Sequence, residues 1–276
     1  MTDKTPAILY ALTTPHPSQP QDHFNTWYDN VHAPSRARCP GVHQVARWVA
    51  TDDSRPGWLA TYELNDASAL QTDAYKQARL NDGDDETTMF SDLSRRVYNL
   101  LSDKTCTEYA TYCASGKPRA MTHVAVHPDK STDLTDDEFN KWYEEEHVPL
   151  LSKCPGWLRS TRWVLVDEKD PRNGQFSETA RFLACHEWED ADVVYGSDEF
   201  SHAVTTPWRT RVMSNIDRQT EERRLFQLWR QFLPDGTSVA AEQKQTKMRS
   251  WGDIKAVPTS TRALLFYWLY KYPTHL

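Results

Sequence analysis

Two histidines of this chain stand in the same short motif. His32 and His147 each lie eight residues after a phenylalanine and four after a tyrosine, and each precedes a proline by two positions. Residues three or four apart share one face of a helix, so the histidine, the tyrosine and the phenylalanine form a single stripe. An imidazole in such a place can accept or donate a proton near neutral pH. The motif therefore predicts a proton-transfer site, with a histidine packed in an apolar core as the plainer interpretation.

The proline limits where each histidine can lie in its helix. A residue that precedes proline is disfavoured in the helical conformation, so the sequence places each histidine in a last turn or at a kink. An acidic residue, Asp29 or Glu144, stands three positions before each histidine and could fix its tautomer.

The motif belongs to a longer internal repeat. Residues 22–52 and 137–167 align without a gap and share 14 of 31 positions, where chance would give about two at average residue usage. A looser match joins residues 59–66 to residues 183–190. The chain is therefore duplicated, and the equivalent parts of its two halves are expected to fold alike.

Each repeat is expected to have the element order β-α-β-β-α-β. In the second repeat, Thr135-Asp-Asp-Glu138 is a capping-box pattern that predicts the start of the first helix. The expected strands are residues 7–13, 44–51, 59–64 and 109–113 in the first repeat and 121–127, 159–166, 181–188 and 225–228 in the second, with residues 66–78 and 90–101 assigned to the second helix of the first repeat.

These elements predict an α+β fold. Two ferredoxin-like halves would pair their sheets into an intramolecular α+β barrel, because a four-stranded sheet covered by helices on one face needs a partner on the other. We predict one half over residues 1–115, the second over residues 116–234, and a C-terminal extension over residues 235–276 that packs on the barrel. Within the extension, residues 263–270 are apolar and aromatic, and we expect them to form a surface strand or strap.

The repeated motif resembles that of a known superfamily. Phe-x-x-Trp-Tyr-x-x-x-His-x-Pro, followed by Pro-Gly and Arg-Trp, occupies residues 24–48 and again 139–163. It resembles the dimeric α+β barrel superfamily, particularly its EthD-like branch, here as a fused tandem repeat. The spacing from histidine to Pro-Gly is also similar to that of the methylmuconolactone isomerases. The resemblance implies that the histidine lies in a catalytic pocket between helix and sheet.

Members of this superfamily include isomerases, polyketide cyclases, decarboxylases, cofactor-free monooxygenases and haem enzymes. Many fungal EthD-like members serve aromatic polyketide pathways, and most members dimerise. Because this chain carries two copies, the resemblance implies either a monomer that acts as a pseudo-dimer or a homodimer. The second repeat keeps Glu146-His147-Val-Pro, which is closer to the family pattern, and is slightly favoured as the active half.

Aromatic and basic residues near the two histidines are candidates for substrate binding. An arginine before the motif tryptophan could bind a carboxylate or an enolate if it points inward, or be plain surface charge if it points outward. His123 lies on a predicted strand and could join His147 in one pocket. The candidate catalytic residues are His147 and His32, and the candidate binding residues are Tyr143, Trp163, His123, Tyr28, Trp48, Tyr10, Arg162 and Arg47.

Composition excludes several classes of partner. The net charge is −7 and no long run of Lys or Arg occurs, so we expect no nucleic acid. The five cysteines form no C-x-x-C pair, which argues against a zinc site, and we predict no metal and no cofactor. The longest apolar run, Ala263 to Tyr270, is too short to span a bilayer. The N-terminal residues lack the layout of a signal peptide, and we expect a cytoplasmic protein.

We therefore predict a cofactor-independent lyase, isomerase or cyclase of secondary metabolism. Its substrate would be a hydrophobic aromatic or polyketide-like small molecule, and its mechanism histidine general acid–base catalysis through an enol-type intermediate. The alternative is a non-catalytic small-molecule-binding or stress-type protein, since a fold does not choose its function. A haem-dependent enzyme is the third possibility.

Overall fold

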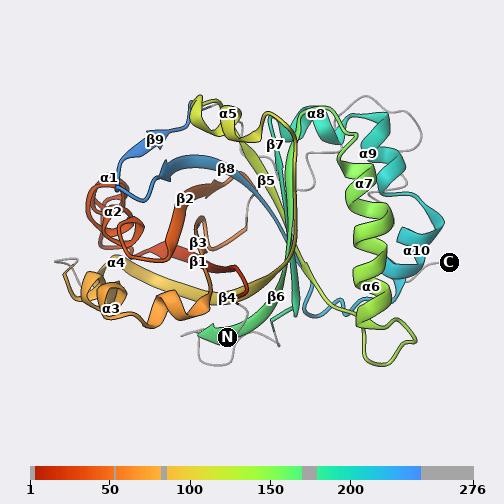
Figure 1. Cartoon of the computed structure of the whole chain (residues 1–276), viewed down its shortest axis with the longest axis horizontal. Coiled ribbons are helices and arrows are strands. Elements are labelled where there is room, and N and C mark those ends of the chain that lie inside the picture. Colours follow the sequence, from red (N-terminus) through yellow and green to blue (C-terminus); the bar gives the residue numbers. More distant parts are fainter. Residues whose placement is uncertain (1–3, 53, 82–85, 170–178, 244–276) are drawn as a thin grey trace.

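Eight antiparallel strands close into a barrel in the computed structural model, which describes residues 4–52, 54–81, 86–169 and 179–243 (Figure 1). The strands follow one another in the order β2-β3-β1-β4-β6-β7-β5-β8, and β8 pairs with β2 to complete the circle. The strands are β1 (Ala7–Pro15), β2 (Val42–Ala50), β3 (Trp58–Leu64), β4 (Phe90–Thr105), β5 (Ala120–Val126), β6 (Trp157–Lys169), β7 (Phe182–Trp188) and β8 (Glu222–Phe232). The predicted α+β class and its barrel are confirmed.

Side chains alternate between the two faces of the barrel wall, as the pleat of a strand requires. On β1, Ala7, Leu9 and Ala11 belong to an apolar core under the helices, whereas Ile8, Tyr10 and Leu12 belong to the core inside the barrel. The chain thus has a barrel interior and, outside it, helix-covered cores. Figure 1 shows α1 to α4 against one side of the wall and α6, α7, α9 and α10 against the other.

The first helix of each repeat is interrupted by a π-helical turn that ends at the motif histidine. In the first repeat α1 (Gln21–Trp27) runs into the turn Tyr28–His32 and then into α2 (Ala33–Ala37). In the second, α6 (Asp136–Trp142) runs into Tyr143–His147 and α7 (Val148–Leu151). Proline has no N–H and its ring crowds the carbonyl four residues earlier, so a wider turn before it relieves the clash. Each histidine thus ends a π-helical turn, but it is not in the last turn of its helix, because the residue before each proline keeps helical angles and the helix continues.

Two local sequence signals have the expected structural effect. The side chain of Thr135 accepts a hydrogen bond from the Glu138 backbone N–H at 3.1 Å and caps α6. After each Pro-Gly the chain turns from helix to strand, and Gly41 and Gly156 have φ of 88° and 71°. Only glycine adopts such angles without strain, and a Cβ on Gly41 would lie 3.0 Å from the Ala69 Cβ.

Two assignments in the first repeat were wrong. Residues 90–101, expected to be helical, belong to β4, because β1 and β6 supply hydrogen-bonding partners along both of its edges. Residues 109–113, expected to be the last strand, lie in the helix α5 (Tyr109–Ala114), which buries none of its residues fully. The remaining helices are a 3₁₀ turn (Ala67–Gln71), α3 (Asp73–Leu80), α4 (Glu86–Met89), α8 (Ala191–Tyr195), α9 (Asp198–Ala203) and α10 (Pro207–Ser214).

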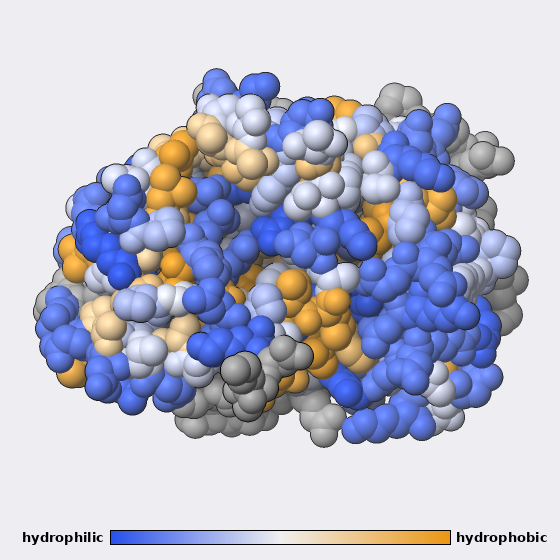
Figure 2. Space-filling model, in the orientation of Figure 1, coloured by the Kyte–Doolittle hydropathy of each residue, from blue (hydrophilic) through white to orange (hydrophobic). Residues whose placement is uncertain are grey.

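The described part of the C-terminal extension begins with a turn. A short strand, β9 (Ser238–Ala240), then pairs with β8. The apolar segment 263–270, expected to be a strap, lies outside the described residues. None of the described helices has the length and apolar character needed to cross a membrane. Hydrophilic residues cover most of the face in Figure 2, with a concentration of hydrophobic surface near its centre, over β6.

Candidate active site

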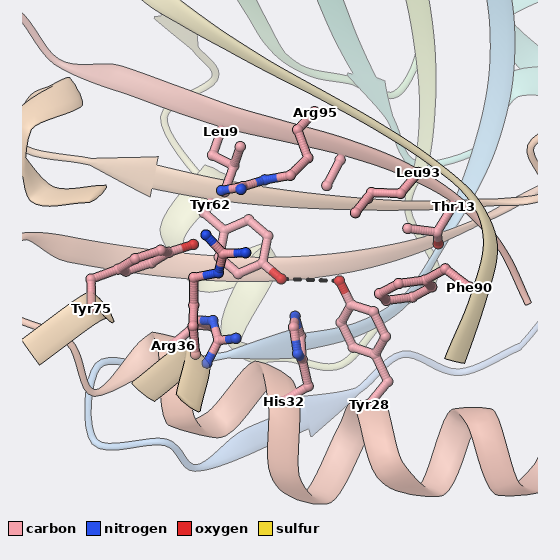
Figure 3. A pocket seen from close by; sticks show the side chains of 12 residues that line it. Leu9, Thr13, Tyr28, His32, Arg36, Tyr62, Tyr75, Phe90, Leu93 and Arg95 are labelled. Atoms are coloured by element: carbon pink, nitrogen blue, oxygen red, sulfur yellow. Dashed lines mark hydrogen bonds between the residues drawn. The ribbon is translucent and has the colours of Figure 1, made fainter. Parts of the chain in front are cut away.

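A pocket opens in the first repeat between the π-helical turn and the outer face of the sheet (Figure 3). His32 and Tyr28 come from the turn, Arg36 from α2 and Tyr62 from β3. The walls add apolar side chains from β1 and β4, namely Leu9, Ala11, Phe90 and Leu93, and polar ones, namely Thr13, Tyr75, Arg79 and Arg95. The motif histidine of this repeat therefore faces a hollow lined by rings, aliphatic groups and arginines.

The pocket is small in this conformation. Its empty volume is about 340 Å³, part of it open to solvent, and the centre of a water molecule can move within only about 20 Å³. Such a space holds a water molecule, so an organic ligand must displace a side chain. Arg79 is exposed and Arg95 half-buried, which makes these two the groups best able to move.

His32 is held between aromatic rings. It is 5% exposed, and its ring centroid lies 4.7 Å from that of Trp27 and 4.6 Å from that of Tyr28. In Figure 3 the imidazole rises from the helix between Arg36 and Tyr28 toward Tyr62. π-helical turns recur at functional sites, and this one directs the imidazole into the pocket.

Two phenols stand beside the imidazole and are joined to each other. The hydroxyls of Tyr28 and Tyr62 lie 3.0 Å apart. Burial, followed by the neighbouring Tyr28 and Tyr75, raises the pKa of Tyr62 well above its ordinary value, while Arg36 opposes the rise. Tyr62 therefore stays protonated near neutral pH. When Tyr28 donates to Tyr62, the Tyr62 O–H can donate to an oxygen atom of a ligand.

Arg47 lies beneath this pocket and supports it. Its guanidinium stacks 4.2 Å from the ring centroid of Tyr28 and 4.5 Å from that of Trp58, and it hydrogen-bonds Asp29. At 1% exposure it is not surface charge. It does not line the pocket either, so Arg47 positions Tyr28 rather than touching a ligand.

The second repeat keeps the arginine over the motif tyrosine and differs in what surrounds the histidine. Its tyrosine, Tyr143, lies under Arg162, whose guanidinium is 4.1 Å from the ring centroid. His147 stacks on Trp142, with centroids 4.6 Å apart and planes at 21°. At the position of Tyr62 the second repeat has His186, 6.1 Å from His147 between centroids. The pocket described above includes no residue of the second repeat.

Four of the predicted binding residues lie inside the barrel. Tyr10, Trp48 and Trp163 belong to the interior core, and His123 is fully buried there, hydrogen-bonded through Nδ1 to the Tyr10 hydroxyl. The barrel wall separates them from both motif histidines. The expectation that His123 joins His147 in one pocket is therefore wrong, because His123 points from β5 into the barrel and His147 lies on the π-helical turn outside it.

The motif did not reveal several residues of the pocket. Arg36 could have been found, since it follows His32 by four residues and so shares its helix face. Tyr62 and Phe90 come from β3 and β4, and only the fold brings them to the histidine. The site therefore depends on contacts that the repeat does not predict.

Buried histidines make the stability of this protein sensitive to acid. Burial is the main cause that lowers the pKa of His123 to about 4 and that of His186 to about 3. The unfolded chain binds these protons near pH 6.5 and the folded chain does not, so stability present above pH 6.5 is lost as the pH falls toward those values. Below pH 6.5 we expect each histidine to lower the free energy of unfolding by about 1.4 kcal/mol for each unit by which the pH falls. Urea unfolding between pH 7 and pH 5 measures this loss.

The variant His186→Asn isolates one of these groups. Asparagine does not titrate, so the loss of unfolding free energy per pH unit should fall by about 1.4 kcal/mol. A wild-type unfolding free energy that stays constant from pH 7 to pH 5 would show that both imidazoles are protonated in the folded state.

A haem does not fit beside either motif histidine in the described residues. An axial histidine must present a ring nitrogen to an open face that a macrocycle can cover. His32 lies between two aromatic rings and faces room for a water molecule, and one face of His147 is covered by Trp142. No group of three His, Cys, Asp or Glu side chains that could hold a metal ion occurs in the described parts of the chain.

Several solved structures have a fold similar to that of this chain. An anthrone oxidase-like protein matches with a TM-score of 0.56 and 12% identity, over 88% of this chain and 98% of its own. The chain shares the α+β barrel fold of this structure. A proposed monooxygenase from Fusobacterium nucleatum matches with a TM-score of 0.52 and 12% identity, over 87% of this chain and 100% of its own.

A mutant chlorite dismutase from Candidatus Nitrospira defluvii is also similar, with a TM-score of 0.50 and 11% identity, over 82% of this chain and 92% of its own. No protein-family model matches the sequence, and neither does any curated protein. At such low identity the likeness shows the fold, and the chemistry must be argued from the residues of this chain.

Proposed function

We propose that this chain is a cofactor-independent enzyme that moves a proton on an enolisable aromatic or polyketide-like molecule, in secondary metabolism. One observation supports the proposal above all. His32, the Tyr28–Tyr62 pair and Arg36 meet in one pocket whose remaining walls are partly apolar. This combination provides a base, a hydrogen-bond donor for a developing oxyanion, a positive charge and a surface for a flat ring system.

The proposed reaction starts at a C–H bond that a carbonyl group makes acidic, either directly next to the carbonyl or conjugated with it through an aromatic ring, as in anthrone. His32 takes the proton, and the electron pair of the broken bond moves to the carbonyl oxygen to form an enolate. The Tyr62 O–H donates to that oxygen, and the guanidinium of Arg36 favours its negative charge. Return of the proton to another carbon gives an isomer, loss of hydroxide gives dehydration, and attack of the enolate carbon on a second carbonyl gives cyclisation.

The neighbouring structures are compatible with this substrate class. Anthrone, after which the anthrone oxidase-like protein is named, is a tricyclic aromatic ketone with an acidic methylene group opposite its carbonyl. We extend this class to the present chain because its pocket has both ring-stacking walls and an oxyanion donor. We also propose that the two repeats pair as two subunits of a dimer would, so that a monomer contains a complete barrel.

Deuterium exchange tests the proposal. Anthrone is incubated in D₂O without oxygen, and deuteration of its methylene group is followed by mass spectrometry with and without the protein. We expect the protein to accelerate exchange above the buffer rate, and to leave 9,10-dihydroanthracene, which has the same skeleton but no carbonyl, unchanged. Saturable binding of anthrone without faster exchange would instead support the non-catalytic binding protein. A purified protein with a haem absorption band would contradict the cofactor-independent assignment.

A further inference from the structure

Three arginines from three separate elements line the pocket at His32. Arg36 lies on α2, Arg79 on α3 and Arg95 on β4. The described residues that line the pocket include no aspartate and no glutamate. A guanidinium keeps its charge at every physiological pH, so the pocket favours a ligand that brings a negative charge.

The arginines and the aromatic wall of the pocket stand on different sides of the imidazole. In Figure 3 the guanidinium of Arg95 and the side chain of Arg36 lie on one side of His32, and Phe90 lies on the other. The ring centroid of Phe90 is 6.4 Å from that of His32. Arg36 is buried and donates a hydrogen bond to Ser35 Oγ at 3.0 Å. A ligand with a flat ring at one end and an anionic group at the other would therefore match the pocket, with His32 between the two ends.

Arg95 is the arginine best placed to bind such a group. Its side chain is half-buried and makes no hydrogen bond or ion pair with any residue that the structure describes. Its pairing partner on β1 is Ala11, whose side chain is too short to cover it, so the guanidinium can lie over the sheet at the pocket. The donors of Arg95 therefore remain available to a ligand.

The register of the sheet identifies the counterpart of Arg95 in the second repeat. Ala60 and Ala184 are equivalent positions of the repeat. From each of them the strand pairing leads across one strand to an arginine, which is Arg95 in the first repeat and Arg223 in the second. The two arginines thus occupy the same place on the barrel wall.

The repeats differ in the residue that precedes this arginine by two positions. In the second repeat it is Glu221, and a carboxylate oxygen of Glu221 lies 2.6 Å from Arg223 Nε. In the first repeat it is Leu93, which lines the pocket. Arg36 also has no charged counterpart, because Leu151 occupies its position and packs in an apolar cluster. The first repeat therefore directs toward its pocket a positive charge that the second repeat neutralises or lacks.

We propose that the substrate of the pocket at His32 is an aromatic carboxylic acid, and that Arg95 together with Arg36 binds its carboxylate. This assignment rests on the proposed proton transfer and defines its substrate class more narrowly. The planar guanidinium of Arg95 can donate two parallel hydrogen bonds to a carboxylate. The aromatic ring contacts Phe90 and Leu93, and the acidic C–H bond faces His32. Anthrone, which has no carboxylate, reports on the proton transfer alone.

Calorimetry with two probes of nearly the same shape tests this assignment. At pH 7 2-naphthoate carries a negative charge and 2-naphthamide carries none. We expect the wild type to bind 2-naphthoate about ten-fold more tightly, because hydrogen bonds between charged groups are the strong ones, and we expect this preference to shrink as the salt concentration rises. Arg95→Gln should raise the Kd of 2-naphthoate about ten-fold and leave that of 2-naphthamide within about two-fold.

A matched pair of variants at Leu93 uses the difference between the repeats. Leu93→Glu places beside Arg95 the carboxylate that Glu221 supplies to Arg223, so the preference for the acid should disappear. Leu93→Gln introduces a side chain of the same size without the charge and should keep the preference. Arg223→Gln, at the equivalent place of the second repeat, should leave both Kd values within about two-fold. Thermal melting followed by circular dichroism confirms that each variant is folded.

Several results would overturn the proposal. They are an absence of binding at millimolar 2-naphthoate, equal Kd values for the two probes in the wild type, a preference for the acid that survives in Arg95→Gln, and a loss of that preference in Arg223→Gln instead. Tighter binding of 2-naphthyl phosphate than of 2-naphthoate would assign the pocket to phosphate esters. Because 2-naphthoate has no acidic C–H bond and the readout is binding, a negative result leaves the proton transfer to be decided by anthrone exchange. A failed exchange, in turn, would leave a measured preference for the acid as a property of a binding protein.

Discussion

Replacement of His32 by glutamine is expected to lower the rate of anthrone deuteration by about 10²–10⁴-fold, the usual contribution of a positioned acid–base group. Glutamine keeps the approximate length of the side chain and can still form hydrogen bonds, but it cannot take up a proton. The loss should be in kcat more than in KM, because the ring-stacking walls that bind the substrate remain. Initial rates of deuterium incorporation at several anthrone concentrations measure both quantities.

Two comparisons make this result specific. His43→Gln removes an exposed histidine of β2 and should leave the rate unchanged. His147→Gln tests the second repeat, which the sequence pattern slightly favours. A large loss in His147→Gln with an unchanged rate in His32→Gln would assign the reaction to the second repeat. Rates within about three-fold of the wild type in both variants would remove the histidine mechanism altogether.

The two repeats differ at a position of the sheet that lies beside the motif histidine. Tyr62 donates or accepts a hydrogen bond with Tyr28, whereas His186, its counterpart, bonds Ser160 instead. The first repeat thereby gains a phenol pair beside its histidine, and the second gains a pair of imidazoles that burial keeps neutral. A tyrosine pair suits the stabilisation of an oxyanion. The divergence of one strand residue therefore changes the chemistry that the same helix motif can perform.

The repeated motif was sufficient to predict the first helix of each repeat and the strands next to it. Its apolar stripe and its Pro-Gly turn are local signals, and local signals determine where an element begins and ends. β4 was mistaken for a helix because its inward residues include Ser94 and Arg96, buried at 0% and 4% exposure. Buried polar side chains conceal the alternation that marks a strand, and only the barrel interior explains them.

The candidate site could be predicted only in part, for a related reason. His32 and Tyr28 lie on one helix face and were identified together. Trp48 and Tyr10 were grouped with them, although they point to the other side of the sheet. A shift of one residue along a strand moves a side chain to the other face of the sheet. Where both faces are buried and apolar, composition alone does not determine which residues point into the barrel.

Removal of the Asp52 carboxylate is expected to destabilise the barrel more than any exposed ion pair could. Asp52 and Arg224 are 2% and 4% exposed and lie 3.1 Å apart where β8 closes against β2. The same carboxylate accepts the backbone N–H of Leu225 at 2.8 Å. Asp52→Ala leaves a buried guanidinium without its counter-charge, which typically costs about 3–5 kcal/mol. Urea denaturation at pH 7, followed by tryptophan fluorescence, measures the loss.

We attribute the expected loss of stability in Asp52→Ala to the guanidinium left without its counter-charge rather than to the lost contact. A double variant separates these two causes. Asp52→Leu combined with Arg224→Met removes both charges, so it should be markedly more stable than Asp52→Ala alone. Glu145→Ala, which breaks an exposed pair with Lys141 at 3.9 Å, should change the unfolding free energy by less than about 0.5 kcal/mol. If Asp52→Ala is no more destabilising than Glu145→Ala, the closure of β2 against β8 does not depend on this pair, and the barrel is held there by backbone pairing and apolar contacts alone.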